Sequence, residues 1–475
     1  MANQESREWA NSGLDLLVEL RRGAGLRVGL EQALREAIRS GRLARDVRLP
    51  PTRALARDLG VSRGTVLQAY GQLAAEGWIA GRQGAGTVVA FDAEAERHAH
   101  AIREPQPIRF RFDLRPGRPD ASSFPRGVWL RALRRALDAA PGDAFDYGDA
   151  RGRLTLRSEL AGYLARARGL RIGASDLLVT SGFTQGLGLV ARALAATGVR
   201  KIAMEEPSMP LHRAIVRAAG HELVLLPVDE DGARVDALQH ERGVGAVVLA
   251  PNRQHPTGAT LSPRRRSLLL EWARTTSALV VEDDYDGEFR YDSHPIGPLQ
   301  GLDPDIVIYA GTASKTLAPG IRLGWLALPA RIRAAAVEEK QRADWGTSAL
   351  EQLAFTELLR NAAYDRHIRT MRLRYRRRRD TLVRLLTAHA PSLELRGTAA
   401  GLNLLIPLPD GQTETAAIAA ANAASIGLDG LTAGGYYEQH PAAGLIVGYA
   451  AAAEHAFEQA ATTLAATLTR IVASE

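Results

Sequence analysis

Hydrophobic residues recur at two different spacings along the chain, and the change of spacing divides it into two parts. In residues 27–41, 52–60 and 62–77, apolar positions return every three or four residues, and glycines follow the first and last stretches. This spacing predicts three helices. Residues 78–90 instead contain two short alternating runs around a glycine-rich tip, which predicts a β-hairpin.

From about residue 113 onward, helical spacing alternates with short, continuous runs of β-branched and apolar residues. These runs occupy residues 176–182, 200–207, 222–228, 244–251, 278–284 and 305–311. Such an alternation predicts an α/β fold with a mostly parallel sheet covered by helices on both faces. Sheets of this kind bind ligands beyond the carboxyl ends of their strands.

The chain is expected to consist of two domains and a linker. We predict an N-terminal domain over residues 14–90 and a linker over 91–112, where periodicity is lost and charge and proline accumulate. The large domain then spans 113–475 and includes a smaller C-terminal α+β subdomain from about 375. Two alanine-rich stretches, 411–425 and 450–467, predict helices in that subdomain.

Composition narrows the classes of protein that remain. The 475 residues include no cysteine, which excludes disulfides and thiolate sites, and we expect no metal centre. No apolar run is long enough to span a membrane and the polar N-terminus lacks a secretory pattern, so we expect a cytoplasmic protein without a membrane partner. Residues 1–90 hold 13 arginines against 9 acidic residues, an excess of +4 that favours an anionic partner.

The third predicted helix has an exposed face suited to DNA. Gly64, Gln68 and Gly71 lie opposite its apolar side, and Arg63 stands at its start. Glycines on an exposed helical face cost stability, which indicates close approach of another backbone. In a DNA major groove, arginine reads guanine or phosphate and glutamine reads adenine. A helix that docks on another protein remains the alternative.

Residues 49–89, LPPTRALARDLGVSRGTVLQAYGQLAAEGWIAGRQGAGTVV, resemble the winged helix-turn-helix of GntR-type regulators over their whole length. The resemblance implies binding to double-stranded operator DNA, and so association with the nucleoid. Its motif positions place DNA contacts at Arg53, Ser62, Arg63 and Thr65, and at Gln83 and Gly84 in the tip of the wing.

One lysine is the strongest chemical signal in the second domain. The chain has only three lysines among 60 basic residues, and Lys315 lies among small residues in GTASKTLAPGIRLGW (311–325). Arginine cannot supply a neutral nucleophilic amine, so Schiff-base chemistry requires lysine. Lys201 and Lys340 lie in charged segments, and we expect both at the solvated surface.

Other motifs match the needs of pyridoxal 5′-phosphate (PLP), which requires an acid at its ring nitrogen, a donor at O3′ and a phosphate site. In VEDDYDGEF (281–289), Asp283 is predicted for the nitrogen and Tyr285 for O3′; Asp284 is the competing acid, although strand alternation points it to the other face. In TSGFTQGL (180–187), a strand-to-helix turn would present backbone N–H groups to phosphate. The predicted phosphate site comprises Phe183, Thr184, Thr312, Ser314 and Arg322.

Residues 113–475 resemble the fold-type I aminotransferases, and in particular those fused behind a GntR head, the MocR/GabR regulators. The matching stretches include YGDARGRLTLRSELAGYLARARGL, PNRQHPTG, EDDYDGEF and GTASKTLAPGIRLGW. The resemblance implies a Schiff base between Lys315 and PLP. It also implies a homodimer in which Tyr147 reaches the cofactor phosphate of the neighbouring subunit. His255 stands where aminotransferases carry the asparagine of NPTG, and an imidazole there could still donate to O3′.

Departures from the family pattern concern the substrate carboxylate. Met209, Leu211 and Ile446 stand where relatives carry a tyrosine and two carboxylate-binding arginines. An unpaired buried carboxylate is costly, so we expect weak or no transamination.

The favoured interpretation is a regulator that senses PLP, nearest the subtype that controls vitamin B6 synthesis or salvage. Three alternatives remain open. One is a regulator that responds to an amine or amino acid through an external aldimine, with Arg213, His212 or His255 holding the effector. The others are an aminotransferase that retains a DNA-binding head, and a remnant without cofactor.

Overall fold

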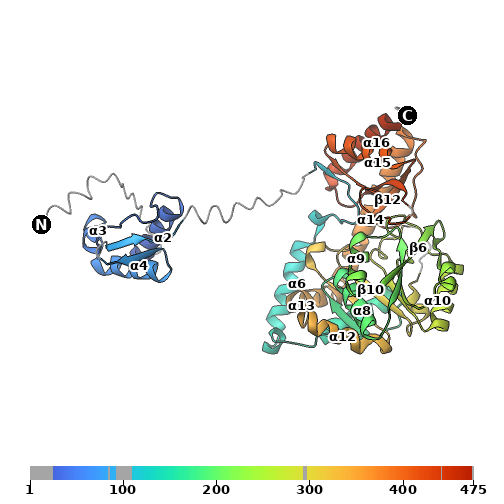
Figure 1. Cartoon of the computed structure of the whole chain (residues 1–475), viewed down its shortest axis with the longest axis horizontal. Helices are drawn as coiled ribbons and strands as arrows, with labels where there is room; N and C mark the ends of the chain where they lie inside the picture. Colours follow the sequence, from blue (N-terminus) through green and yellow to red (C-terminus); the bar gives the residue numbers. More distant parts are fainter. Residues whose placement is uncertain (1–24, 84–85, 93–109, 292–296, 440, 473–475) are drawn as a thin grey trace. The chain divides into compact units, whose positions relative to one another are not determined.

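The computed structural model describes residues 25–83, 86–92, 110–291, 297–439 and 441–472. It divides into two compact units, Met1–Ile108 and Arg109–Glu475, which are taken separately below (Figure 1). None of the helices in these described ranges is long and apolar enough to cross a membrane.

The N-terminal unit contains the predicted helices and hairpin. The helices are α2 (Leu26–Arg39), α3 (Thr52–Asp58) and α4 (Arg63–Ala75), and the strands are β1 (Ile79–Arg82) and antiparallel β2 (Gly86–Val89). Apolar side chains spaced three or four apart meet in one core, among them Leu34 and Ile38 of α2 and Val66 and Leu73 of α4.

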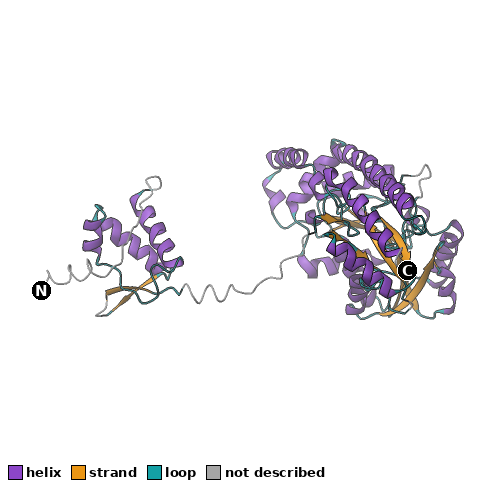
Figure 2. Cartoon of the chain, turned by 90° about the horizontal axis from the view of Figure 1, so that it is seen from above, coloured by secondary structure: helices purple, strands orange, loops and turns teal. Residues whose placement is uncertain are grey.

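An eight-stranded sheet forms the centre of the large unit (Figure 2). Its strands lie in the order β4 (Leu177–Thr180), β11 (Gly324–Ala327), β10 (Val307–Thr312), β9 (Leu279–Asp283), β8 (Val244–Leu249), β5 (Lys201–Glu206), β6 (Glu222–Asp229), β7 (Gly232–Ala233). All six predicted strands are present, and β10, β9, β8, β5 and β6 pair in parallel. The predicted α/β class is therefore confirmed.

Helices cover both faces of this sheet. One face packs on α8 (Phe183–Ala196) and α12 (Ala330–Asp344). The other packs on α7 (Leu154–Arg168) and α13 (Ala349–Arg360) at one end and on α10 (Pro263–Thr276) at the other. The remaining helices of this part are α6 (Arg126–Ala139), α9 (Pro210–Ala218) and α11 (Leu299–Leu302).

A smaller three-stranded antiparallel sheet lies in the C-terminal part, where we expected mixed α and β structure. It contains β12 (Asn403–Leu408), β15 (Ala443–Gly448) and β14 (Asp429–Gly430), and shares a core with α14 (Ala363–His389), α15 (Gly411–Ala423) and α16 (Phe457–Val472). The second alanine-rich stretch becomes helical at Phe457, later than expected.

The predicted linker ends earlier than residue 112. Residues 93–109 lie outside the described residues, but Phe112 is buried and begins β3 (Phe112–Asp113), which pairs in parallel with β13 (Ile426–Gly427). The chain therefore pairs with a strand of the C-terminal part before it contributes the first strand of the eight-stranded sheet.

Candidate functional site

A pocket of about 820 Å³ lies beyond the carboxyl ends of β9 and β10, where parallel sheets bind ligands. Nine of the predicted cofactor residues line it. They are Phe183, Thr184, His255, Asp283, Tyr285, Thr312, Ser314, Lys315 and Arg322. These residues come from five separate stretches of sequence, and the fold brings them together.

The side chain of Lys315 is half-buried and lines this pocket. Its Nζ donates a hydrogen bond of 2.5 Å to the carbonyl oxygen of Gly117. Burial lowers the pKa of the Lys315 amine, and the nearby carboxylates of Asp283 and Asp286 only partly oppose that effect. A lowered pKa increases the fraction of neutral, nucleophilic amine.

The two neighbouring aspartates differ in their partners. Asp284 binds Arg168 at 2.6 Å, Asn252 at 3.0 Å and the hydroxyl of Tyr309 at 2.8 Å. Burial opposes its ionisation, but these partners hold the pKa of Asp284 below its usual value. Asp284 is therefore paired within the protein and does not line the pocket.

Asp283, in contrast, faces the pocket with an unused oxygen. Its Oδ1 is buried and has no hydrogen-bond partner among the described residues. Burial, and next the charge of Asp284, raise the pKa of Asp283 well above its usual value. A buried acceptor without a donor is costly, and a protonated pyridine nitrogen would supply that donor. The residue present thus fits the ring of PLP.

The phosphate site is built around the start of α8. Gly182 precedes the helix at φ 93°, and no side chain caps the first turn. The Arg322 guanidinium lies 3.4 Å from the point where a Cβ on Gly182 would stand. Thr312 and Ser314 add two hydroxyls 3.0 Å apart. Free N–H groups, a helix N-terminus, hydroxyls and a guanidinium together suit a phosphate dianion.

The two histidines at the pocket are neutral. Burial, and next the charge of Arg253, lower the pKa of His255 to about 3. Burial also lowers the pKa of His212 to about 4, with Lys315 as the next cause. The Tyr285 hydroxyl accepts a hydrogen bond of 3.0 Å from Arg253, which leaves its own proton free to donate. With these pKa values, neither imidazole carries a positive charge at neutral pH.

Arg213 is not available to a ligand. It is buried, and its guanidinium donates to the carbonyls of Ser208, Gly435 and Tyr436 and pairs with Glu438 at 2.9 Å. The structure therefore contradicts the alternative in which Arg213 holds an effector. Its donors instead fix the segment after β14 against the start of α9.

Arg118, which no sequence motif indicated, also lines the pocket. Among the described residues, its guanidinium pairs with Asp113 at 3.4 Å, and that carboxylate already pairs with Arg115 at 2.7 Å. Arg118 follows Gly117, whose carbonyl oxygen accepts the hydrogen bond from Lys315. The local sequence contains no motif that would have identified this turn as part of a site.

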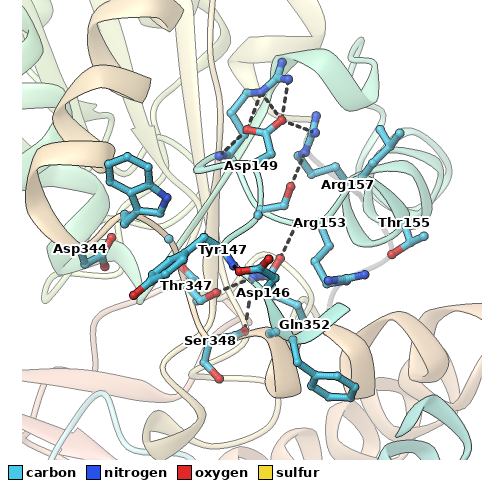
Figure 3. A pocket seen from close by; sticks show the side chains of 18 of the residues that line it. Asp146, Tyr147, Asp149, Arg153, Thr155, Arg157, Asp344, Thr347, Ser348 and Gln352 are labelled. Atoms are coloured by element: carbon cyan, nitrogen blue, oxygen red, sulfur yellow. Dashed lines mark hydrogen bonds and ion pairs between the residues drawn. The ribbon is translucent and has the colours of Figure 1, made fainter. Parts of the chain in front are cut away.

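Tyr147 lies outside the cofactor pocket. Its side chain is 87% exposed and borders a second pocket, of about 940 Å³, between residues 145–157 and 344–352 (Figure 3). There its ring stands edge-on to Trp345, with centroids 6.4 Å apart.

The predicted DNA-contacting residues occupy α3, α4 and the hairpin of the N-terminal unit. Arg53, Arg63, Gln68 and Gln83 are exposed, whereas Gly84 lies outside the described residues. Ser62 and Thr65 bond each other: Ser62 Oγ accepts from the Thr65 backbone N–H at 3.0 Å and caps α4.

Comparisons with known proteins agree with both units. The profile of the gntR family of bacterial regulatory proteins matches residues 17–89, and that of aminotransferase class I and II matches residues 119–425. An archaeal alanine:glyoxylate aminotransferase has the same fold as the large unit, with a TM-score of 0.70 and 26% identity over 80% of this chain and 95% of its own.

Two regulators are similar to this chain over most of their own length. The pyridoxine biosynthesis transcriptional regulator PdxR of Corynebacterium glutamicum is 33% identical over 79% of this chain and 82% of its own. The probable rhizopine catabolism regulatory protein MocR of Rhizobium meliloti is 31% identical over 89% of each chain. A DNA-binding head and an aminotransferase-type pocket for PLP together define a transcription regulator. The chain belongs to the MocR/GabR-type regulators, which join a GntR head to an aminotransferase-like domain.

Proposed function

We propose that this regulator senses PLP itself and controls genes of vitamin B6 metabolism. One contrast within the pocket carries the proposal. The groups that PLP requires line the pocket, whereas apolar Leu211 and Ile446 stand at the two positions expected to bind a substrate carboxylate. Such a site recognises the cofactor better than it recognises an amino acid.

Each pocket residue has a distinct part in holding the cofactor. Lys315 would bind its aldehyde and Asp283 its ring nitrogen, while Tyr285 and His255 would donate to O3′. The first turn of α8, with Thr312, Ser314 and Arg322, would hold its phosphate. Bound PLP supplies an electrophilic aldehyde and an electron-accepting ring. Without a carboxylate clamp, the pocket orients amino acids poorly, and we infer that transamination is weak or absent.

The regulatory output would come from a change in the arrangement of two heads. We infer a homodimer in which the exposed Tyr147 completes the phosphate site of the neighbouring subunit. PLP then shifts the equilibrium between two dimer arrangements by its difference in affinity for them. A cytoplasmic protein of this kind would meet both operator DNA and free PLP. The similarity to a relative named for pyridoxine biosynthesis supports this effector.

The test compares operator affinity for apo-protein and PLP-loaded protein, by fluorescence anisotropy at fixed salt. A PLP sensor changes its operator affinity, or its footprint, when PLP is added. If PLP leaves both unchanged while one amino compound alters them, PLP sensing is wrong.

The second candidate is a response to a carboxylate-bearing amine, and Arg118 favours it. Lys315 and Arg322 are engaged by the cofactor, so Arg118 is the remaining cation among the described residues that line the pocket. Its single long ion pair leaves donors for a carboxylate.

The two candidates differ in what Arg118→Ala changes. For a PLP sensor, this variant retains the operator response to PLP. For a sensor of a carboxylate-bearing amine, PLP alone has no effect, and the variant loses the response to amino acids while simple amines still react with the cofactor.

A further inference from the structure

Lys340 is fully buried, although its charged sequence context predicted a solvated surface residue. Its ammonium, on α12, donates to three oxygens: Gln185 Oε1 at 2.9 Å, Asp344 Oδ2 at 2.9 Å and Thr347 Oγ1 at 3.0 Å. An ammonium has three donors, and each has one acceptor here. A planar guanidinium cannot reproduce this arrangement, which explains a lysine at this position in a chain with only three lysines.

On one side, the ammonium holds the residue that shapes the entrance to α8. Gln185 is the third residue of that helix, and its Oε1 also accepts the Ser181 backbone N–H at 2.8 Å. Its Nε2 donates to Asp344 at 2.5 Å. By binding Ser181, Gln185 sets the turn at Gly182 and leaves the N–H groups of Phe183 and Thr184 to a ligand.

On the other side, the ammonium holds the loop that follows α12. Asp344 is the last residue of that helix, and the Thr347 hydroxyl donates to the Val179 carbonyl of β4 at 3.3 Å. Between them stands Trp345, half exposed, at φ 62°, with its ring against Tyr147. Asp344, Thr347 and Tyr147 border the same surface pocket (Figure 3).

We propose that Lys340, Gln185 and Asp344 form a positioning unit that joins the phosphate-binding turn of α8 to the loop of residues 344–348. Lys340 is a positioning residue, since it acts on the ligand through Gln185. The unit makes phosphate binding and the position of the Trp345–Tyr147 surface interdependent, because a coupling between two sites acts in both directions. This inference rests on the proposed phosphate site at Phe183 and Thr184.

The first experiment separates positioning from general stability by comparing PLP with pyridoxal, which lacks the phosphate. Apo-protein is titrated with each, for wild type, Lys340→Met and Lys340→Arg. Lys201→Met is the matched control. Lys201 lies on β5 of the eight-stranded sheet, is partly exposed and pairs with Glu222, so its replacement removes a lysine charge away from the turn. Loss of charged hydrogen bonds at the turn predicts PLP affinity about tenfold lower in both Lys340 variants, with pyridoxal affinity and the control unchanged.

The outcomes are distinct from those of the proposed phosphate site. If wild type binds PLP and pyridoxal equally, the phosphate site itself is wrong and the inference falls with it. If wild type prefers PLP and Lys340→Met prefers it equally, the positioning role alone is wrong. If Lys340→Met lowers the affinities for PLP and for pyridoxal equally, Lys340 only stabilises the fold, and the inference is wrong.

The second experiment reads the coupling at the far end. Hydrogen exchange is measured on peptides covering 344–348, with and without PLP, in the full chain. In wild type, PLP should slow exchange there, and in Lys340→Met it should not. Asp344→Asn, at a partly exposed position, serves if the lysine variant does not fold. Asp344→Asn should show a smaller decrease in PLP affinity and a smaller loss of the PLP effect on exchange. If both quantities equal those of wild type, the proposed unit is wrong.

Discussion

Lys340 is buried and Lys315 is half-buried, and the surroundings of the two amines separate their roles. Burial lowers the pKa of each. Lys340 has three oxygen acceptors, one of them a carboxylate, which keep it charged and fixed. Lys315 has a single carbonyl acceptor beside an open pocket. The smaller number of acceptors and the contact with the pocket together distinguish Lys315 as the amine that can react.

Replacing Lys315 should abolish covalent retention of PLP. Wild-type protein loaded with PLP and reduced with borohydride is expected to gain the mass of the reduced adduct at Lys315, and Lys315→Ala should gain none. Arginine at this position should behave as alanine, because it supplies no neutral amine. Lys201→Ala is the control. A reduced adduct retained by Lys315→Ala would move the site to another lysine.

Glu205, buried at the pocket, should impose a pH dependence on stability. Its Oε2 accepts the Ala250 N–H at 3.0 Å, and burial raises its pKa from 4.5 to about 8. A raised pKa in the folded state gives stability that is complete below 4.5 and is lost as pH rises to about 8. Glu205→Gln removes this loss, so its melting temperature relative to wild type should increase between about pH 5 and pH 8. If the difference in melting temperature between the two proteins stays constant across that pH range, the assignment is wrong.

At the scale of elements, continuous apolar runs predicted six strands because parallel strands are buried on both faces. β11 was not predicted because Gly324–Ala327, which pairs antiparallel between β4 and β10, contains no β-branched residue. Site residues such as Lys315 and Asp283 could be predicted because the chemistry of the cofactor requires their particular residue types. The roles of Arg118 and Lys340 were not predicted because they depend on contacts with residues distant in sequence. A local sequence pattern carries no information about such contacts.

Gly71 of α4 should show a conflict between stability and DNA binding. A Cβ there would meet no atom within 4 Å, so nothing inside the protein requires glycine. Gly71→Ala is expected to stabilise the helix by about 0.5–1 kcal/mol and to weaken operator binding, because the added methyl group lies on the face predicted to approach DNA. Hydrogen exchange of α4 and anisotropy titrations measure the two effects. Undiminished binding would remove this face from the interface.

Arg63, exposed at the start of α4 and unpaired among the described residues, should contribute to the DNA interface. Arg63→Ala is expected to weaken operator binding by about 1–3 kcal/mol if the arginine reads a base. Arg264→Ala, exposed in the large unit, removes the same charge away from the head and should have little effect. Affinity should also fall steeply with salt. Equal effects of the two variants would indicate a general charge contribution only.

At the scale of the whole molecule, the position of Tyr147 is consistent with the homodimer proposed above, in which one chain alone would not hold a complete site. The tyrosine is 87% exposed on a surface apart from the pocket of its own chain. Exposed Phe145, Leu154 and Trp345 surround it. Exposed apolar groups gathered around a pocket are typical of surfaces that bind another protein, and a second copy of the chain would supply that partner.

A shared site predicts complementation between two defective variants. Lys315→Ala lacks the amine and Tyr147→Ala lacks the tyrosine, so each homodimer should retain PLP poorly: the first fails to form an adduct, and the second binds PLP weakly. In a mixed twofold dimer, the amine of one subunit and the tyrosine of the other form one complete site. Random mixing would therefore restore tight binding at about a quarter of all sites. The measurement is PLP retention after borohydride reduction at limiting PLP, before and after the two proteins exchange subunits. Retention equal to the average of the separate variants would show that Tyr147 serves its own chain or no site at all.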